Sequence, residues 1–197
     1  MKKLIGIIVS TAIALQSIGV VYAQDYLINE TFDNQPSNKT TDIFKKDGSG
    51  TLRVTENGKN DKELLVKGEM LLTKDFSKTP GNTIALSAEL LSPDAGCSLT
   101  IGVYDKNGAK TTWVNVNSGA IISPKGSKIL HIVPKENPLK ITILYDKLFG
   151  VYNLYANGRC IWRNERAGHI DAAGFFLQNS RGDIRIDNVY AYEGDDI

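Results

Sequence analysis

Two strand-like runs meet at Asn157-Gly158, and this junction constrains the fold more than any other feature of the chain. A type I′ turn requires positive φ at both central residues, and Asn followed by Gly tolerates this conformation best. The segment 151–162 is therefore predicted to be a β-hairpin. Counting outward from the turn places Trp162 opposite Asn153, on the face that carries Tyr155 and Cys160.

The rest of the chain repeats this pattern of short strands. Roughly a dozen alternating or apolar runs are separated by Gly, Pro, Asn and Ser, at the spacing typical of sandwiches and barrels. In one of these runs, residues 139–146, apolar side chains occupy every second position. No segment after the first 23 residues shows sustained helical periodicity. We therefore expect an all-β antiparallel fold, either a sandwich or a barrel, that forms one domain over residues 24–197.

The first 23 residues have the features of a secretory signal peptide. Lys2-Lys3 precede an apolar run from Leu4 to Leu15, and the small residue Ala23 provides a cleavage position. A single membrane anchor is the alternative, but polar residues interrupt the run, and no cysteine follows it to accept a lipid. We expect a secreted, extracellular protein of bacterial type that begins at Gln24 and has no membrane contact after cleavage.

Charge and cysteine content limit the possible partners. The net charge is +1, and Lys and Arg are interspersed with Asp and Glu along the chain, so a nucleic-acid partner is not expected. Cys97 and Cys160 form either one disulfide or two buried thiols, and both readings stay open. Neither cysteine has a histidine at metal-ligand spacing, which argues against zinc. The sequence leaves the oligomeric state open.

A second hairpin is predicted around Asn107-Gly108. With a two-residue turn, Ile101 lies opposite Val114 and Gly102 lies opposite Trp113. One face of this hairpin is then aliphatic. The other face is polar apart from two aromatic residues, and it includes Tyr104, Trp113, Asn115 and Asn117.

The final strand-like run, residues 183–192, changes its pattern midway. Ile184 and Ile186 share one face, whereas Val189 and Ala191 have the opposite parity. A β-bulge at Asp187-Asn188 would return all four side chains to the core.

These C-terminal runs together resemble a known group of folds. The strand ending at Asp146, the hairpin 151–162, the run from Gly174 and the run ending at Tyr192 resemble the C-terminal half of concanavalin A-like lectin, glucanase and laminin-G jelly rolls of secreted bacterial proteins. The resemblance implies a jelly-roll sandwich whose first strand, near Asn29–Phe32, pairs with the last. The group contains sugar-binding modules, hydrolases, lyases and adhesive domains, so the fold does not select the function.

Carbohydrate binding is the function that the side chains favour. Sugars present apolar faces to aromatic rings and hydroxyl groups to amides and carboxylates. The face with Tyr104, Trp113, Asn115 and Asn117 has this composition, and Asn153 with Trp162 forms a second candidate patch. The alternative is that Trp113 shields Gly102 or packs under a loop, and Cys160 suggests that the second patch is buried.

Catalysis is the competing prediction. Glycoside hydrolysis needs two carboxylates, and the glucanases of this resemblance place them as Glu-x-Asp-x-x-Glu, a spacing that is absent here. A lyase would use a histidine or tyrosine base beside an arginine that neutralises a uronate. The chain contains His131, His169, Arg163 and Arg166, but neither histidine lies in a lyase-like motif. A structural or adhesive surface domain is the third possibility, for which Arg181-Gly182-Asp183 is a weak signal.

A structural calcium ion is a separate hypothesis. In related sandwiches the first and last strands share such an ion, and Glu30 and Asp187 carry the oxygen ligands that calcium prefers. Alternatively, Asp187 accepts hydrogen bonds within the bulge and Glu30 is exposed.

Overall fold

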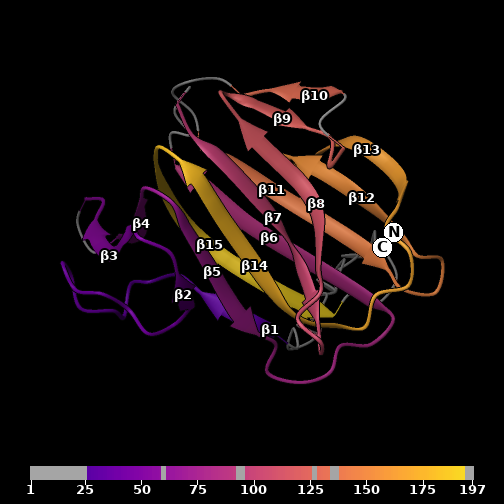
Figure 1. Ribbon diagram of the computed structural model, residues 1–197, viewed down its shortest axis with the longest axis horizontal. Coiled ribbons are helices and arrows are strands. Elements are labelled where there is room, and N and C mark those ends of the chain that lie inside the picture. The colour runs from indigo at the N-terminus through magenta and orange to yellow at the C-terminus, as the bar shows by residue number, and fades with distance from the viewer. Residues whose placement is uncertain (1–25, 59–60, 92–95, 126–127, 134–137, 194–197) are drawn as a thin grey trace, which may run out of the picture.

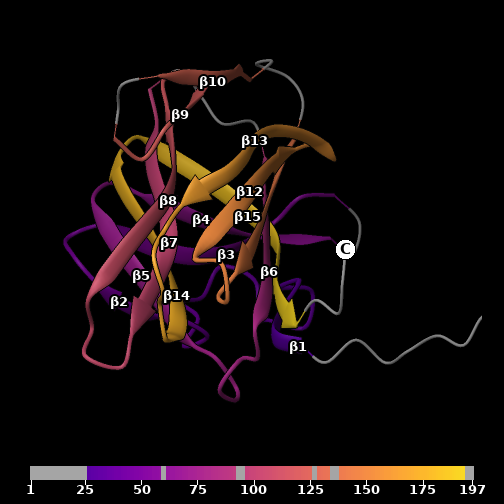
Figure 2. The same cartoon turned by 90° about the vertical axis from the view of Figure 1, so that its right-hand side faces the viewer.

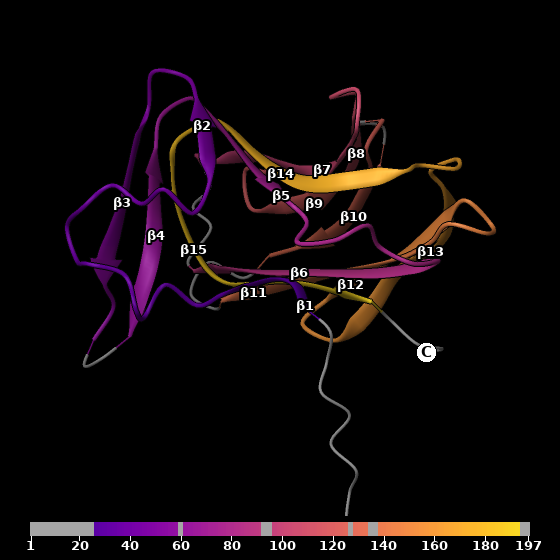
Figure 3. The same cartoon turned by 90° about the horizontal axis from the view of Figure 1, so that it is seen from below.

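The computed structural model describes residues 26–58, 61–91, 96–125, 128–133 and 138–193, which fold into two antiparallel β-sheets packed face to face. Figure 3 shows the two layers, with β7 and β14 in one and β6 and β11 in the other. The fold is therefore the predicted antiparallel β-sandwich. The signal-peptide segment lies outside the described residues. No helix in the described part of the chain is long and apolar enough to span a membrane.

The first layer, here called the terminal sheet, contains the first and last strands. Its strand order is β13 (Arg159–Arg166), β12 (Val151–Ala156), β11 (Leu139–Asp146), β6 (Thr83–Leu91), β15 (Asp183–Glu193), β4 (Lys62–Lys67) and β3 (Thr51–Glu56). β1 (Tyr26–Glu30) pairs with β15, as the resemblance implied. In Figure 1, β3 and β4 lie at one end of the molecule and β12 and β13 at the other.

The second layer, here called the facing sheet, has β14 near its centre. Its strand order is β10 (Ile129–Ile132), β9 (Ala120–Ile122), β8 (Lys110–Asn117), β7 (Ser98–Asp105), β14 (Ala172–Arg181), β5 (Met70–Asp75) and β2 (Lys45–Asp47). Figure 2 shows β9 and β10 at the same end of the sandwich as β13.

The core between the sheets follows from period-two alternation. On β11, Leu139, Ile141, Ile143 and Tyr145 are buried, while the residues between them are half-buried or exposed. Facing side chains from β7, including Leu99 and Ile101, are also buried. Each sheet thus contributes one apolar face to the core, because side chains alternate along a strand.

The two Asn-Gly turns differ from each other. Asn157 and Gly158 have φ of 48° and 78°, and Ala156 pairs with Arg159, so the predicted two-residue turn is confirmed. The Asn107-Gly108 turn is instead a three-residue loop, since Tyr104 pairs with Lys110 and the backbone N–H of Asp105 donates to the carbonyl of Ala109 at 3.0 Å. The predicted register of β7 against β8 is therefore wrong by one residue between the loop and Gly102.

A β-bulge at Trp113 corrects that register and changes the face of the tryptophan. Gly102 pairs with Thr112 and Ile101 pairs with Val114, so Trp113 is the extra residue of β8. Its side chain enters the core and is fully buried. Phe176 takes the position across Gly102 that was predicted for Trp113: a Cβ on Gly102 would come within 2.8 Å of the Phe176 ring.

The predicted bulge in β15 is present. The pairing of β15 with β6 shifts register between Asp187 and Tyr190, and Asn188 has a φ of 49°. Ile184, Ile186, Val189 and Ala191 are all buried, as the bulge requires. The cysteines are not joined by a disulfide: Cys97 is buried and Cys160 is half-buried on β13.

Candidate functional site

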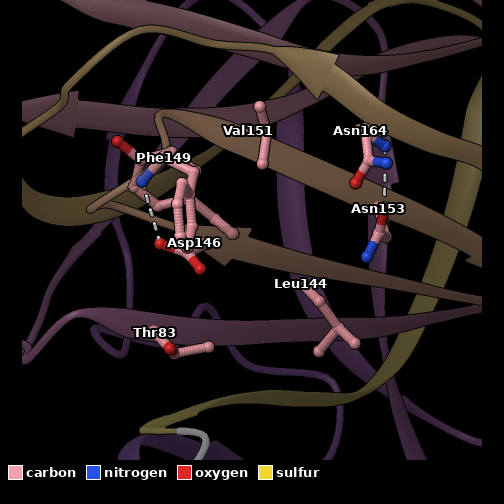
Figure 4. Close-up of a pocket in the computed structure, with 8 residues that line it drawn as sticks. Thr83, Leu144, Asp146, Phe149, Val151, Asn153 and Asn164 are labelled. Carbon is pink, nitrogen blue, oxygen red and sulfur yellow. Dashed lines mark hydrogen bonds between the residues drawn. The ribbon is translucent and has the colours of Figure 1, made fainter. Parts of the chain in front are cut away.

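The candidate site is a hollow of about 470 Å³ on the outer face of the terminal sheet, beside the turn that joins β11 to β12. Figure 4 shows Phe149 with Asp146 on one side and Asn153 with Asn164 on the other. The residues that line it are Thr83, Leu144, Tyr145, Asp146, Phe149, Val151, Asn153 and Asn164.

Phe149 is the most exposed large apolar residue among those described, with 76% of its surface accessible. A large apolar side chain in water gains about 1.5–3 kcal/mol when a partner buries it. Leu148, the preceding residue, is also 62% exposed. The turn thus presents two apolar side chains beside a polar hollow, which is a feature of binding surfaces.

Hydrogen bonds hold this turn in one conformation. The carboxylate of Asp146 accepts the N–H of Phe149 at 3.1 Å, and the carbonyl of Gly150 accepts the N–H groups of Ala167 and Gly168 at 2.9 and 3.0 Å. A Cβ on Gly150, whose φ is 62°, would come within 3.0 Å of the Gly168 backbone. The aromatic ring of Phe149 is therefore presented by a pre-organised turn.

The 167–171 loop fixes the turn from its other side. The hydroxyl of Tyr145 donates to the carbonyl of Gly168 and accepts the N–H of Ile170, both at 2.8 Å. An ion pair of 2.5 Å joins Lys147 to Asp171, and the Lys147 ammonium lowers the pKa of that carboxyl group. These contacts leave little freedom for the segment that carries Phe149.

The polar side of the hollow consists of amides. A bulged β13 places Asn164, with a φ of 52°, next to Asn153 on β12. The N–H of Asn164 donates to Oδ1 of Asn153 at 2.9 Å, which fixes the orientation of the Asn153 amide. Nδ2 of Asn153 and the side-chain amide of Asn164 then remain to bind hydroxyl groups of a ligand.

The predicted platform around Trp113 is not a surface feature. Trp113 lies in the core, with its ring centroid 5.1 Å from that of Tyr145 and 5.9 Å from that of Tyr152. The Tyr152 hydroxyl donates to the carbonyl of Trp113 at 2.8 Å. The prediction failed because the β-bulge turns this one residue inward. The stated alternatives are not observed either, since Phe176 lies across Gly102 and Trp113 packs in the core between the sheets.

Tyr104, Asn115 and Asn117 do lie on the outer face of the facing sheet, but their polar atoms bind neighbouring residues. The Tyr104 hydroxyl donates to Asp75 at 2.6 Å, and both burial and this hydrogen bond raise the pKa of Tyr104. Oδ1 of Asn115 accepts from Thr100 at 2.9 Å, and Oδ1 of Asn117 accepts from Ser118 at 2.9 Å. This face is thus occupied by its own hydrogen bonds.

The second predicted patch is divided between two faces. Trp162 pairs with Leu154, not with Asn153, because β13 contains bulges that shift the register. The Trp162 side chain is half-buried against the core, with the ammonium of Lys128 5.7 Å from its ring centroid. Asn153 belongs to the hollow, so the structure does not bring these two residues together.

Glu30 and Asp187 have protein partners. Glu30 lies 3.5 Å from the ammonium of Lys74, and Asp187 accepts the N–H of Asn188 at 2.7 Å. In the described parts of the chain, no group of three or more His, Cys, Asp or Glu side chains is placed to hold a metal ion. The structure therefore supports the alternative for Asp187, hydrogen bonding within the bulge.

Sequence reasoning missed most of this hollow. Of the lining residues, Asn153 was singled out from the sequence as a binding residue, whereas Thr83, Asp146, Phe149 and Asn164 were not. The available signal was the apolar pair Leu148-Phe149 in the short connection between the predicted strand 139–146 and the hairpin 151–162, where polar residues are usual. Candidate bases for a lyase are also separated: His131 and His169 line two different hollows.

Comparison with known proteins finds structures with a similar fold but no family model and no curated protein that matches in sequence. A sialidase structure aligns with a TM-score of 0.67 and 10% identity over 87% of this chain, which spans only 19% of the sialidase.

Two smaller structures align over nearly their full length. Domain 4 of the extracellular arabinanase AbnA from Geobacillus stearothermophilus, solved with arabinotriose, aligns with a TM-score of 0.57 and 18% identity, covering 87% of this chain and 93% of that domain. A structure from work on endo-acting O-glycanases of human gut microbiota aligns with a TM-score of 0.58 and 10% identity over 87% and 100%. The chain therefore shares the β-sandwich fold of carbohydrate-active proteins.

Proposed function

We propose that this protein is a secreted, non-catalytic β-sandwich module that binds an extracellular or cell-wall carbohydrate in the hollow beside Phe149. The observation that carries the proposal is the 76% exposed phenylalanine on a hydrogen-bonded turn, next to a hollow of about 470 Å³. A ligand that covers this exposed ring removes apolar surface from water, which favours binding. The rigid support of the ring means that little entropy is lost when a ligand binds.

The lining matches the two kinds of surface that a sugar presents. The Phe149 ring suits the apolar C–H face, while the Asn153 and Asn164 amides, the Asp146 carboxylate and the Thr83 hydroxyl suit the hydroxyl groups. The structural neighbours support a carbohydrate as the ligand class, since one of them was solved with arabinotriose.

Binding is favoured over hydrolysis by the composition of the hollow. Glycosidases use two carboxylates about 5–10 Å apart. Among the residues that line the hollow, Asp146 is the one that carries a carboxylate. Reducing-sugar and unsaturated-uronate assays test the enzyme alternative, and product release by the wild-type protein, lost in an Asp146→Asn variant, would contradict the proposal.

Two finer assignments belong to the same proposal. The pairing of β1 with β15 supports placing the sandwich in the concanavalin A-like jelly-roll group. The Lys2-Lys3 run and Ala23 support secretion with cleavage before Gln24. Mass spectrometry of the exported protein tests the second assignment, and a mature chain that retains residues 1–23 would contradict it.

Replacing Phe149 by alanine is expected to weaken carbohydrate binding roughly 10- to 30-fold, since the buried area of one aromatic ring is lost. Affinity electrophoresis in gels that contain xylan, arabinan, β-glucan, galactan or mannan identifies the retained polymer, and titration calorimetry measures the change. The thermal midpoint should stay the same, because the ring makes few contacts with the fold.

Ile132→Ala is the matched control for this experiment. Ile132 is similarly exposed, at 65%, but it lies on β10 in the facing sheet. Equal loss of affinity in both variants, or full affinity in Phe149→Ala, would show that the hollow is not the binding site.

A further inference from the structure

Two cross-strand rows extend from the hollow over the outer face of the terminal sheet. The first row contains Asn153, Leu144, Ala85 and Tyr192, which are direct partners on β12, β11, β6 and β15. It continues to Tyr26 on β1, which pairs with Tyr192. Direct partners on antiparallel strands point to the same face, so these side chains form a continuous line.

The second row runs parallel to the first. It contains Tyr155, Thr142, Ser87 and Tyr190, again direct partners on β12, β11, β6 and β15. The Ser87 and Thr142 hydroxyls lie 3.2 Å apart, and the Tyr26 ring centroid lies 5.8 Å from that of Tyr190. We call these two rows together the neutral strip.

The neutral strip carries no charged residue, although 23% of the residues in the chain are charged. Charges begin in the rows on either side of it. Glu89 pairs with Lys140 in the row beyond Ser87, and Asp146 pairs with Thr83 in the row beyond Ala85. A solvent-facing sheet normally alternates apolar core residues with charged outer ones, so two adjoining uncharged rows indicate a surface that meets a partner.

The floor of the strip is made of small residues. Ala85 and Ser87 are buried on β6, between their larger partners on β11 and β15. Tyr26, Tyr190 and Tyr192 lie at one end of the strip, and Tyr155 lies with Asn153 at the end beside the hollow. Strands in a sheet are about 4.8 Å apart, so the distance from Tyr192 to Asn153 across three strand spacings is about 14 Å.

We propose that the neutral strip is the extension of the carbohydrate site and that it binds an uncharged, extended glycan chain of several sugar units laid across the strands. This inference rests on the proposed function, since it takes the hollow as one end of the same site. The span exceeds one sugar ring, which favours internal segments of a polymer over single terminal sugars. None of the side chains that make up the strip is charged, although Arg163 interacts with Tyr155 and Cys160 at its β13 end. The composition of the strip therefore favours neutral sugars over uronates or sialic acids, which would leave carboxylates unpaired along most of its length.

The test uses a length series of the retained polymer, from the monosaccharide to the hexasaccharide, in the xylo-, arabino-, cello-, galacto- or manno-series. Affinity of the wild-type protein should rise at least tenfold from the disaccharide to the tetrasaccharide. Tyr192→Ala should lower the affinity for the longer oligosaccharides about tenfold and leave the affinity for the disaccharide unchanged. Tyr26→Ala, at an exposed position, should act in the same direction with no effect on folding.

Ile129→Ala on β10, an exposed apolar residue outside the strip, serves as the control. Equal affinity for mono- and hexasaccharides, with no effect of Tyr192→Ala or Tyr26→Ala, would overturn the strip while leaving the hollow intact. Retention of no polymer would overturn the proposed function itself. If Tyr26→Ala instead changes only the oligomeric state in sedimentation, the strip is a contact between copies of the chain and the inference is wrong.

Discussion

Trp113→Ala is expected to lower the free energy of unfolding by about 3–5 kcal/mol, the range for removing a large aromatic side chain from a packed core. Trp113 is fully buried and packs between Tyr145 and Tyr152. Both tyrosines come from strands that flank the β11–β12 turn, so a cavity here would also loosen the support of Phe149. Urea unfolding, with the m-value checked for two-state behaviour, measures the loss.

Trp113→Phe separates the contribution of volume from that of the indole N–H. Nε1 of Trp113 is buried and has no hydrogen-bond partner among the described residues. A phenylalanine keeps much of the ring and removes this unsatisfied donor, which itself costs about 1–3 kcal/mol, so the variant should lose clearly less stability than alanine. Trp162→Ala, at a half-buried position, should also lose less. Carbohydrate binding lost in Trp113→Phe, with stability unchanged, would restore the platform that the sequence suggested.

The position of Trp113 shows why one residue can mislead a register argument. The loop is one residue longer than predicted, which shifts each partner on β8 by one residue. The extra residue at Trp113 reverses this shift, so the predicted and observed pairings agree from Ile101 onward. Val114 and Val116 therefore appear on the correct face under either reading. The aliphatic pattern that supported the two-residue turn could not reveal the error. The side chain of Asp105, which accepts the N–H groups of Asn107 and Ala109 at 2.8 and 2.9 Å, stabilises the longer loop.

The bulge in β15 was predictable because its pattern changes within one strand. Ile184 and Ile186 have one parity and Val189 and Ala191 the other, so no regular strand buries all four. At Trp113, in contrast, an aromatic residue suits either face. The sequence thus specifies a bulge when aliphatic residues change parity, and leaves it hidden when only one residue is displaced.

The candidate site was predictable only in part for a related reason. Asn153 was singled out because strand register gives the face of a residue directly. Phe149 and Asn164 owe their positions to contacts between the β11–β12 turn, the bulged β13 and the 167–171 loop. Contacts between segments distant in sequence leave no periodic signal.

Asp187→Asn is expected to stabilise the protein by about 2–3 kcal/mol at pH 7.5 and to have almost no effect at pH 4. Burial raises the pKa of Asp187 to about 6, and the nearby carboxylates of Asp61, Asp33 and Glu89 raise it further, against the opposing hydrogen bond from Asn188. A pKa difference of one corresponds to about 1.4 kcal/mol, and the pKa of about 6 exceeds the ordinary aspartate value of 3.8 by about two. Asparagine keeps an oxygen that can accept the Asn188 N–H.

The sign follows from the order of the two pKa values. Below pH 4 the carboxyl group is protonated in both the folded and the unfolded chain, so its contribution to stability is fully present. Between pH 4 and 6 the unfolded chain releases the proton while the folded chain retains it, and the contribution is lost as the pH rises through 6. The stability difference between Asp187→Asn and the wild type should therefore grow with pH and level off near pH 7.

Asp183→Asn is the matched control, because Asp183 lies on the same strand and its side chain is 55% exposed in an ion pair with Lys67. It should show no such growth with pH. The same two variants also test the calcium hypothesis. A bound cation would lower the pKa of Asp187 and make the Asp187→Asn variant less stable than the wild type at neutral pH. Denaturant unfolding of both variants from pH 4 to 8, with and without a chelator, measures the difference. A wild-type protein that is more stable than Asp187→Asn at pH 7.5, and loses this advantage to the chelator, would establish the metal site instead.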